Sequence, residues 1–434
     1  MKYYSTNRSV SAVSLQEAVT RGIAGDKGLF MPERIELLPA SFYERIHEMS
    51  FREISLEVAL KFFGEDIPEE ALRELVYDTL SFDCPVIHVQ DQIYALELYH
   101  GPTMAFKDVG GRFMARLLGY FLKGSQKQVD VLVATSGDTG SAVANGFLGV
   151  PGIRVYVLYP KGLVSGIQEK QFTTLGQNIT ALEVDGTFDD CQRLVKEAFL
   201  DEELGRVLTL TSANSINVAR FLPQSFYYFN AYARLRQMGV EDEIVMAVPS
   251  GNFGNLTAGL FAKRMGLPVK RFLAANNEND VVYRYLQTGS YEPRRSVATI
   301  ANAMDVGDPS NFARILDLYG NSHQAICAEL QGFRYSDKEI RRVVRELYTA
   351  SGYLLDPHGA TAYQALSESL QEGESGVFLE TAHPAKFPDT MESVMGKGKV
   401  AVPDKLAGFL RRKKQSLPLS RDFEDFKFFL LRQQ

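Results

Sequence analysis

Lys107 lies among residues that could make its amine reactive. It belongs to the stretch HGPTMAFKDVGG (100–111), in which an apolar Met-Ala-Phe run precedes the lysine and two glycines follow within four residues. A lysine that such neighbours partly desolvate has a lowered pKa, and its neutral amine can form an imine with an aldehyde. Because most lysines are solvated surface residues, Lys107 indicates a site only together with other groups.

A loop of small and hydroxyl-bearing residues follows the apolar run VLVAT. It reads SGDTGS (136–141) and opens the helical pattern SAVANGF. Backbone amides at a helix start, with hydroxyl groups beside them, can bind a carboxylate or a phosphate. The same residue types form ordinary helix caps and tight turns, so both interpretations stay open for this loop alone.

A second glycine-containing loop follows the apolar run IVMAVP. It reads SGNFGN (250–255) and leads into the helical pattern LTAGLFAKRMG. Two glycines three residues apart let the backbone approach an anion closely, and the helix start adds free amides, so the loop predicts a phosphate-binding cup. It matches neither GxGxxG nor GxxxxGK[ST], and standing alone it would be a simple turn.

Thr381 comes directly after the strand pattern GVFLE and could hydrogen-bond a buried ring nitrogen, although alone it is more typical of a helix cap. Four features now stand together: a reactive amine, a phosphate cup, a carboxylate-binding loop and a hydroxyl at a strand end. They are the parts of a pyridoxal phosphate site, which needs an imine-forming lysine, a phosphate holder, a ring-nitrogen partner and a carboxylate clamp.

The elements that must position these residues alternate along the chain. From about residue 129, short apolar runs alternate with amphipathic helical patterns such as FDDCQRLVKEAFL. This order predicts an α/β fold of two doubly wound, mostly parallel sheets with helices on both faces. The strands are expected at VDVLVAT, IRVYVLYP, ITALEV, RVLTLTS, EIVMAVPS, VKRFLAA and GVFLET.

The first 85 residues form a different region, which is rather polar and predicted to be mainly helical, with a helix starting at Pro68-Glu69-Glu70. VIHVQDQIYALELYHG, which follows, predicts a hairpin. We expect three regions: the helical region 1–85, a smaller α/β domain 86–225 with Lys107, and a larger α/β domain 226–434 with Thr381.

Composition excludes several classes of protein. The 434 residues carry a formal charge of −6, which argues against binding to nucleic acid. Three well-separated cysteines and six histidines show no disulfide, zinc or HExxH spacing, and there is no GxSxG elbow, so no metal is expected. Without a signal segment or a spanning apolar run, we expect a cytoplasmic protein that does not bind membranes. The basic cluster Arg411–Lys414 is expected on the solvated side of a C-terminal helix.

Five segments together resemble a known family. HGPTMAFKDVG, ATSGDTGSA, TSANSINVAR, PSGNFGN and ETAHPAKF occur in the order and spacing typical of the threonine synthases, in the long form of bacteria and fungi. Asp26–Phe30 and Asn302–Val306 extend the resemblance over nearly the whole chain. It implies a fold-type II pyridoxal phosphate enzyme, a carbon–oxygen lyase that converts O-phospho-L-homoserine and water to L-threonine and phosphate, the last step of threonine biosynthesis.

The resemblance also implies roles for individual residues. Lys107 would hold the cofactor covalently and then move protons at the substrate carbons, and Thr381 would face the pyridine nitrogen. The residues that would bind the cofactor phosphate are Gly251, Asn252, Phe253, Gly254 and Asn255. Ser136, Gly137 and Asp138 would hold the substrate carboxylate, with Asp138 also near the ring hydroxyl. The residues that would take the substrate phosphate are Thr135, Thr139, Asn214 and Arg220.

Two alternatives remain. Another fold-type II enzyme, such as a serine or threonine dehydratase or a cysteine synthase, would share the cofactor loops but would not need Asn214 and Arg220. A catalytically silent homologue that binds the cofactor would release no phosphate. More distant relatives carry Asn in place of Asp138, so the protonation state of this carboxyl is open. We expect a monomer or a weak homodimer that takes a small-molecule substrate.

Overall fold

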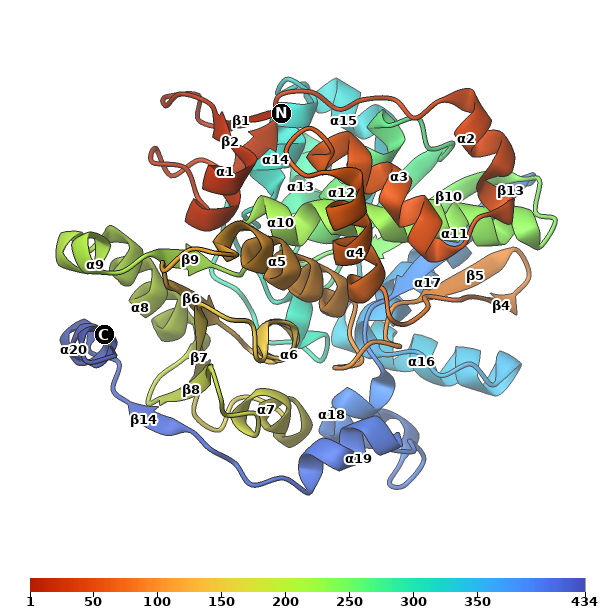
Figure 1. Cartoon of the computed structure of the whole chain (residues 1–434). Coiled ribbons are helices and arrows are strands. Elements are labelled where there is room, and N and C mark those ends of the chain that lie inside the picture. Colours follow the sequence, from red (N-terminus) through yellow and green to blue (C-terminus); the bar gives the residue numbers. More distant parts are fainter. Residues whose placement is uncertain (434) are drawn as a thin grey trace.

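Two sheets organise the computed structural model, which describes residues 1–433 (Figure 1). The larger sheet has the strand order β12-β11-β10-β13-β5-β4, and only β4 is antiparallel to its neighbour. Its strands are β4 (Val86–Gln90), β5 (Ile93–Glu97), β10 (Glu243–Pro249), β11 (Arg271–Asn276), β12 (Leu330–Arg334) and β13 (Glu374–Glu380).

The smaller sheet is parallel throughout, in the order β14-β8-β7-β6-β9. Its strands are β6 (Val129–Ala134), β7 (Ile153–Pro160), β8 (Ile179–Val184), β9 (Leu210–Ser212) and β14 (Leu417–Leu419). Every residue of β6 is buried, as expected of a parallel strand with helices on both sides. The predicted α/β class with two mostly parallel sheets is confirmed.

Helices cover both faces of the two sheets. The helices that accompany the smaller sheet are α5 (Lys107–Leu122), α6 (Asp138–Phe147), α7 (Gly166–Thr173), α8 (Phe188–Leu200), α9 (Glu202–Val207), α19 (Asp404–Leu410) and α20 (Phe423–Leu431). Between β9 and β13 come α10 (Val218–Phe221), α11 (Ser225–Gln237), α12 (Gly254–Arg264), α13 (Val281–Thr288), α14 (Phe312–Leu318), α15 (His323–Glu329), α16 (Asp337–Ser351) and α17 (Pro357–Ser369), and α18 (Pro388–Met395) follows β13.

The N-terminal region packs onto this body. Its helices are α1 (Leu15–Arg21), α2 (Ala40–Arg45), α3 (Phe51–Phe63) and α4 (Glu69–Thr79), and α4 begins directly after Pro68 as predicted. The region also contains a small antiparallel sheet of β1 (Lys2–Ser5), β2 (Val13–Ser14) and β3 (Phe30–Pro32), which the helical patterns did not reveal. Its apolar side chains belong to the same core cluster as α5 and parts of both sheets.

Pairing between strands crosses the domain limits expected from the sequence. The predicted hairpin forms as β4 and β5, but it lies in the larger sheet together with β10–β13. At the other end of the chain, β14 pairs with β8 in the smaller sheet, and Figure 1 shows the C-terminal segment running from α19 across to that sheet. The limits at residues 85 and 225 therefore stay a prediction, because β4 and β5 of the smaller predicted domain join the larger sheet and β14 of the larger predicted domain joins the smaller sheet.

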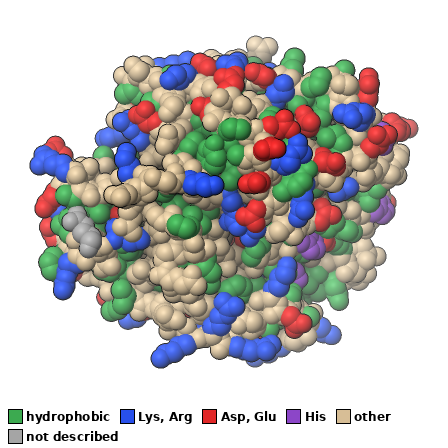
Figure 2. Space-filling model, in the orientation of Figure 1, with side chains coloured by type: hydrophobic (Ala, Val, Ile, Leu, Met, Phe, Trp, Pro, Cys, Tyr) green, Lys and Arg blue, Asp and Glu red, His purple; other side chains and the backbone are tan. Residues whose placement is uncertain are grey.

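Two local expectations were wrong. RVLTLTS forms a strand only at β9, because Asp201 caps the short helix α9, which takes up the residues before it. Arg411–Lys414 does not lie on a helix, since α19 ends at Leu410, and Lys414 instead pairs with Glu169 and Glu183. Figure 2 shows acidic and basic side chains interspersed over the upper part of one face and mainly basic ones along its lower margin.

Candidate active site

A cavity of about 790 Å³ lies where loops from both sheets meet. The loops that follow β6, β10 and β13 all contribute to its wall, as expected for a ligand site at the carboxyl ends of parallel strands. The predicted site residues on this wall are Lys107, Thr135, Ser136, Thr139, Asn214, Arg220, Gly251, Asn252, Phe253, Gly254, Asn255 and Thr381. Gly137 and Asp138 are not part of the wall, and Asp138 is buried.

The loop before Lys107 is fixed to the end of β13. Ala105 and Ala382 form an isolated antiparallel bridge, and the Phe106 N–H donates to the carbonyl of Thr381 over 2.8 Å. This bridge holds the start of α5 beside the end of a strand that is far away in the sequence. Lys107 and Thr381 therefore reach the same cavity.

The Lys107 amine makes no hydrogen bond or ion pair with any side chain or carbonyl of the described residues, and it shares the cavity with other charges. Burial lowers its pKa to about 8; Asp138 opposes this shift, while Arg220 and Lys386 add to it. An amine with this pKa has a sizeable neutral fraction near neutral pH, as a nucleophile or a proton carrier requires.

Close packing of α5 against α6 depends on glycine. A Cβ on Gly111 would lie 2.8 Å from the carbonyl oxygen of Ala142, and one on Gly146 would lie 2.8 Å from the backbone of Gly111. The two helix backbones can touch only because these side chains are absent. Both helices start at the site, α5 with Lys107 and α6 with Asp138.

Thr135 organises the loop between β6 and α6. Its Oγ1 accepts hydrogen bonds from the N–H groups of Gly137 (2.9 Å) and Gly140 (2.8 Å), so the hydroxyl proton is left for another acceptor. Gly137 has a φ of +149°, and a Cβ there would lie 2.6 Å from the side chain of Gln168. The turn that presents Ser136 and Thr139 to the cavity therefore requires glycine at 137.

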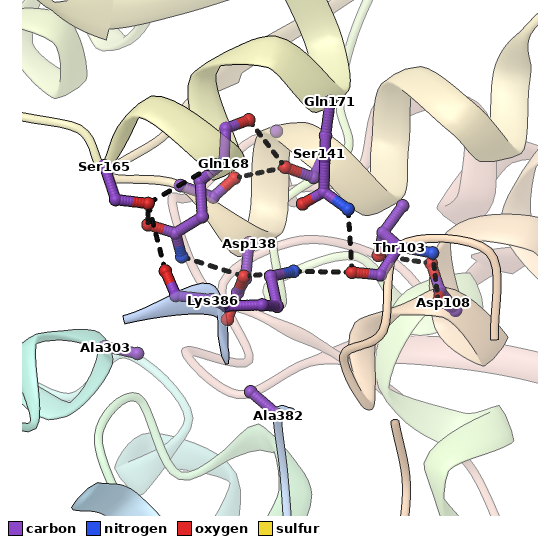
Figure 3. Close-up of polar contacts among 12 residues, drawn as sticks. Thr103, Asp108, Asp138, Ser141, Ser165, Gln168, Gln171, Ala303, Ala382 and Lys386 are labelled. Atoms are coloured by element: carbon purple, nitrogen blue, oxygen red, sulfur yellow. Dashed lines mark hydrogen bonds and ion pairs between the residues drawn. The ribbon is translucent and has the colours of Figure 1, made fainter. Parts of the chain in front are cut away.

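Asp138 lies between two donors behind the cavity wall (Figure 3). Lys386 Nζ lies 2.6 Å from Asp138 Oδ1, and Gln168 Nε2 donates to the same oxygen over 2.9 Å. Burial acts to raise the pKa of this carboxyl, but the nearby charges of Lys386 and Lys107 have a larger opposite effect. The resulting pKa is about 2. Asp138 is thus a buried carboxylate that is ionised at neutral pH.

The loop after β10 forms a row of free backbone donors. None of the N–H groups from Gly251 to Asn255 donates a hydrogen bond to a described residue, and α12 begins within this row. Phe253 adopts a left-handed conformation with φ 61° and ψ 8°, which is uncommon for a bulky residue. Successive amides turned to one side by such a residue form an anion-binding concavity, reinforced by the helix dipole.

Arg220 and Asn214 form a second candidate anion-binding place on the wall. Arg220 is only 2% exposed and has no acidic partner among the described residues; one guanidinium nitrogen donates to the carbonyl of Ala213, and its Nε is unsatisfied. Burial lowers the pKa of Arg220 to about 10, so it stays charged at neutral pH. Asn214 lines the cavity beside Arg220, and its Nδ2 donates to no described residue. A buried charge without an acidic partner and a free amide donor on a cavity wall are expected to be satisfied by an anionic ligand.

The N-terminal region holds the loop that carries Asn214. Asn217 Nδ2 donates to the carbonyl of Val19 over 2.9 Å, and the buried Arg314 bridges the carbonyls of Phe30 and Ile216. Both links join the first 30 residues to residues 214–217. The helical region thus contributes to the shape of the site, a role that the sequence did not reveal.

Further wall residues were not predicted. His358 Nε2 accepts from the Ala303 N–H (3.2 Å), so its Nδ1 carries the proton and donates to Asp356 (2.6 Å). Asp356 also accepts from the N–H of Ala382, next to Thr381. The sequence signal for this pair was Asp356-Pro357-His358, a capped helix start with chemistry-bearing residues.

Lys386 lies in the segment ETAHPAKF, but the sequence predicted no role for it. Its signal, a lysine between apolar residues in HPAKF, resembles that of Lys107 in MAFKD. Nothing in the local sequence showed that it pairs with Asp138. Among residues 1–433 no cluster of His, Cys, Asp and Glu is arranged to hold a metal ion, and no helix is long and apolar enough to cross a membrane.

Three family models match consecutive parts of the chain. Residues 76–381 match the model described as pyridoxal-phosphate dependent enzyme, residues 2–80 the threonine synthase N terminus, and residues 358–429 the threonine synthase C-terminal model. The threonine synthase of Serratia marcescens is 44% identical over 99% of both chains, and that of Escherichia coli (strain K12) is 46% identical over 92% of both.

Solved structures agree with these matches. The crystal structure of threonine synthase from Escherichia coli has a TM-score of 0.93 at 44% identity and covers 100% of both chains. The structure of PLP-bound threonine synthase from Brucella melitensis has a TM-score of 0.93 at 33% identity, over 99% of this chain and 98% of that one. The chain therefore belongs to the threonine synthase family of pyridoxal phosphate-dependent enzymes.

Proposed function

We propose that this chain converts O-phospho-L-homoserine and water to L-threonine and inorganic phosphate, with pyridoxal phosphate as cofactor. One observation carries the proposal beyond the family match. The cavity has two separate anion-binding places, the amides of Gly251–Asn255 and the unpaired Arg220 with Asn214. A cofactor phosphate needs one of them, and a phosphorylated substrate needs the other.

The residues present fit the cofactor. The free amides of Gly251–Asn255 suit a phosphate monoester, Lys107 supplies a partly neutral amine for its aldehyde, and Thr381 offers a neutral hydroxyl on the same wall. Asp138 would lie near the ring hydroxyl. When bound, pyridoxal phosphate supplies an electron sink for carbanions at substrate carbons. Because Thr381 carries no charge, it would leave the ring nitrogen less positively charged than a carboxylate would.

The loop after β6 is suited to the substrate carboxylate. Ser136 and Thr139 line the cavity, and Gly137 between them is the N-cap residue of α6. Thr135 can only donate from its hydroxyl, because Gly137 and Gly140 occupy its acceptor positions. The hydroxyl of Thr135 therefore favours an anionic partner.

Arg220 and Asn214 would hold the substrate phosphate, with Thr135 and Thr139 as further donors. Arg220 lines the cavity without an acidic partner among the described residues, and a guanidinium forms strong charge-assisted hydrogen bonds with phosphate oxygens. Fixing this group would orient the substrate so that Lys107 Nζ can remove and return protons at Cα and Cβ. Loss of phosphate from Cγ and addition of water at Cβ would follow.

A dehydratase-like activity has less support. Such an enzyme would have no use for a buried, unpaired Arg220, whose burial without an acidic partner costs free energy of folding. A silent homologue would not need a lysine with a lowered pKa. A cytoplasmic location and a monomer or weak homodimer, with no nucleic-acid or membrane partner, remain part of our proposal; three free cysteines support a reducing compartment.

The test is the reaction itself. Purified protein with added pyridoxal phosphate is given O-phospho-L-homoserine, and phosphate and threonine are quantified together. We expect equal amounts of both. If neither product forms while the absorption spectrum shows lysine-bound pyridoxal, the cofactor assignment stands and the substrate assignment is wrong.

A further inference from the structure

Lys386 is a second lysine beside the site, and it is fully buried. It lies in the turn Pro384–Lys386 after β13 and is 0% exposed. Its Nζ lies 2.6 Å from Asp138 Oδ1 and donates to the carbonyl of Thr103 over 2.7 Å, and its own carbonyl accepts from Ser165 over 3.1 Å. Figure 3 shows Lys386 reaching between Asp138 and Thr103.

The pair joins the two sheets at the cavity. Asp138 follows β6 of the smaller sheet, whereas Lys386 follows β13 of the larger one. An ammonium group without access to water is stable only when a carboxylate and further hydrogen bonds compensate its charge. Gln168 satisfies the carboxylate further, so the ion pair is closed within the protein.

The charges around Lys107 come from several elements. Asp138 faces it from α6, Arg220 from α10 and Lys386 from the turn after β13. Asp108, the next residue on α5, accepts hydrogen bonds from Thr103, and burial raises its pKa. His383, close to Lys386, has a pKa that burial lowers. Among the described residues that shift the pKa of Lys107, only Asp138 raises it, and Lys386 pairs with that carboxylate.

We propose that Lys386 is a positioning residue: by neutralising Asp138 across the two sheets, it keeps the Lys107 amine free to react near neutral pH. This role deepens the proposed function, in which Lys107 is the reactive amine. No proton or bond to Lys386 itself is required. Its charge acts only through Asp138 and through direct repulsion of the Lys107 ammonium form.

Three variants should shift the pKa of Lys107 in different directions. Lys386→Met leaves Asp138 uncompensated, so the pKa of Lys107 should rise by at least one unit, with about a tenfold loss of neutral amine at pH 7. Asp138→Asn leaves the Lys386 charge uncompensated, so the pKa should fall. The double variant Asp138→Asn/Lys386→Met removes both charges, so the pKa should return to near the value of the unsubstituted protein.

The experiment measures the amine directly in the full chain purified without pyridoxal phosphate. Trace labelling with acetic anhydride over a range of pH, against a reference amine, gives the pKa of Lys107 from the yield of its labelled peptide. Lys414→Met is the matched control, because Lys414 pairs with Glu169 and Glu183 and does not line the cavity. It should leave the profile unchanged.

The outcomes separate this inference from the proposed function. Opposite shifts in the single variants and restoration in the double variant support it, even for a protein inactive on O-phospho-L-homoserine. Equal profiles in all variants overturn it, even if the unsubstituted protein makes threonine. If Lys386→Met does not fold, Asp138→Asn and the double variant still decide, because a role of Lys386 limited to packing predicts the same pKa of Lys107 in both, whereas the proposal predicts a higher pKa in the double variant.

Discussion

One buried cation, Arg220, lines the cavity and another, Lys386, lies behind its wall, and they differ in what neutralises them. Lys386 is paired with Asp138, whereas Arg220 has an unsatisfied Nε and no acidic partner among the described residues. Both are at most 2% exposed. Since an isolated buried charge is costly, the two arrangements imply different purposes: the paired cation serves a group of the protein, and the unpaired one is held for an anionic ligand.

The comparison also explains a cost in stability. Without ligand, the buried charge of Arg220 is only partly compensated by hydrogen bonds, and this lowers the stability of the folded protein. A phosphate that binds only the folded state would stabilise that state by mass action. The Lys386 pair brings no such dependence on ligand, because both charges belong to the chain.

The largest effect is expected at Arg220. Arg220→Met removes the charge but keeps an unbranched side chain, and each lost hydrogen bond from a charged group costs about 1.5–3 kcal/mol. With two such bonds to phosphate, kcat/KM for O-phospho-L-homoserine should fall by about 10²- to 10⁴-fold, measured by phosphate release, while bound pyridoxal phosphate keeps its absorption. The exposed Arg206, paired with Glu202, gives the control Arg206→Met. A loss below tenfold would assign the phosphate to other residues.

The next prediction compares the two cations by stability. Lys386→Met should lower the free energy of unfolding by about 3 kcal/mol, because it leaves a buried carboxylate without its partner. Arg220→Met should leave the ligand-free protein unchanged or more stable. Thermal and urea midpoints of the ligand-free variants measure both. Destabilisation of similar size in both would show that Arg220 is as well compensated as Lys386.

Glu380 extends the comparison to a buried acid. Burial, with Asp356 nearby, raises the pKa of Glu380 well above its ordinary value; one oxygen accepts from the Asp356 N–H and the other has no partner. The folded state therefore binds a proton that the unfolded state releases, and stability falls as pH rises above about 4.5.

Glu380→Gln removes the titratable group, so this difference in bound protons between the folded and unfolded states disappears. The stability of the variant relative to the unsubstituted protein should increase from pH 5 to pH 8, by up to about 1.4 kcal/mol per pH unit. Urea unfolding at several pH values measures the difference. A difference that does not change with pH would mean that Glu380 is ionised in the folded state.

The smallest expected effect concerns the loop that carries Asn214. Asn217→Ala breaks the hydrogen bond to the carbonyl of Val19, and also removes a bond to Ser212 and the N-cap of α10. It should raise KM for O-phospho-L-homoserine a few-fold, since each lost neutral bond costs about 1 kcal/mol. The control is Asn178→Ala, which loses similar bonds to Phe147 and Ile153 away from the cavity. If both variants change KM equally, the link to the N-terminal region does not shape the site.

The sequence predicted the buried parallel strands because uninterrupted apolar runs leave little ambiguity. It did not predict β12 and β14, which are short edge strands with exposed residues, or the small sheet β1–β3. The loops at the strand ends were also predicted, since their glycine, hydroxyl and amide residues directly follow apolar strand patterns in the sequence. What could not be predicted was pairing over long distances, such as Asp138 with Lys386 and Arg314 with Phe30. Those contacts depend on how two sheets and the N-terminal region meet.

The central claim is that the site holds two phosphates, one on backbone amides and one on an unpaired arginine. A crystal structure of the chain grown with pyridoxal phosphate and inorganic phosphate tests it most directly. The account predicts the cofactor phosphate on the amides of Gly251–Asn255 and a separate phosphate within hydrogen-bond distance of the Arg220 guanidinium and Asn214 Nδ2. A cofactor phosphate bound at Arg220, or a free phosphate only elsewhere, would contradict it.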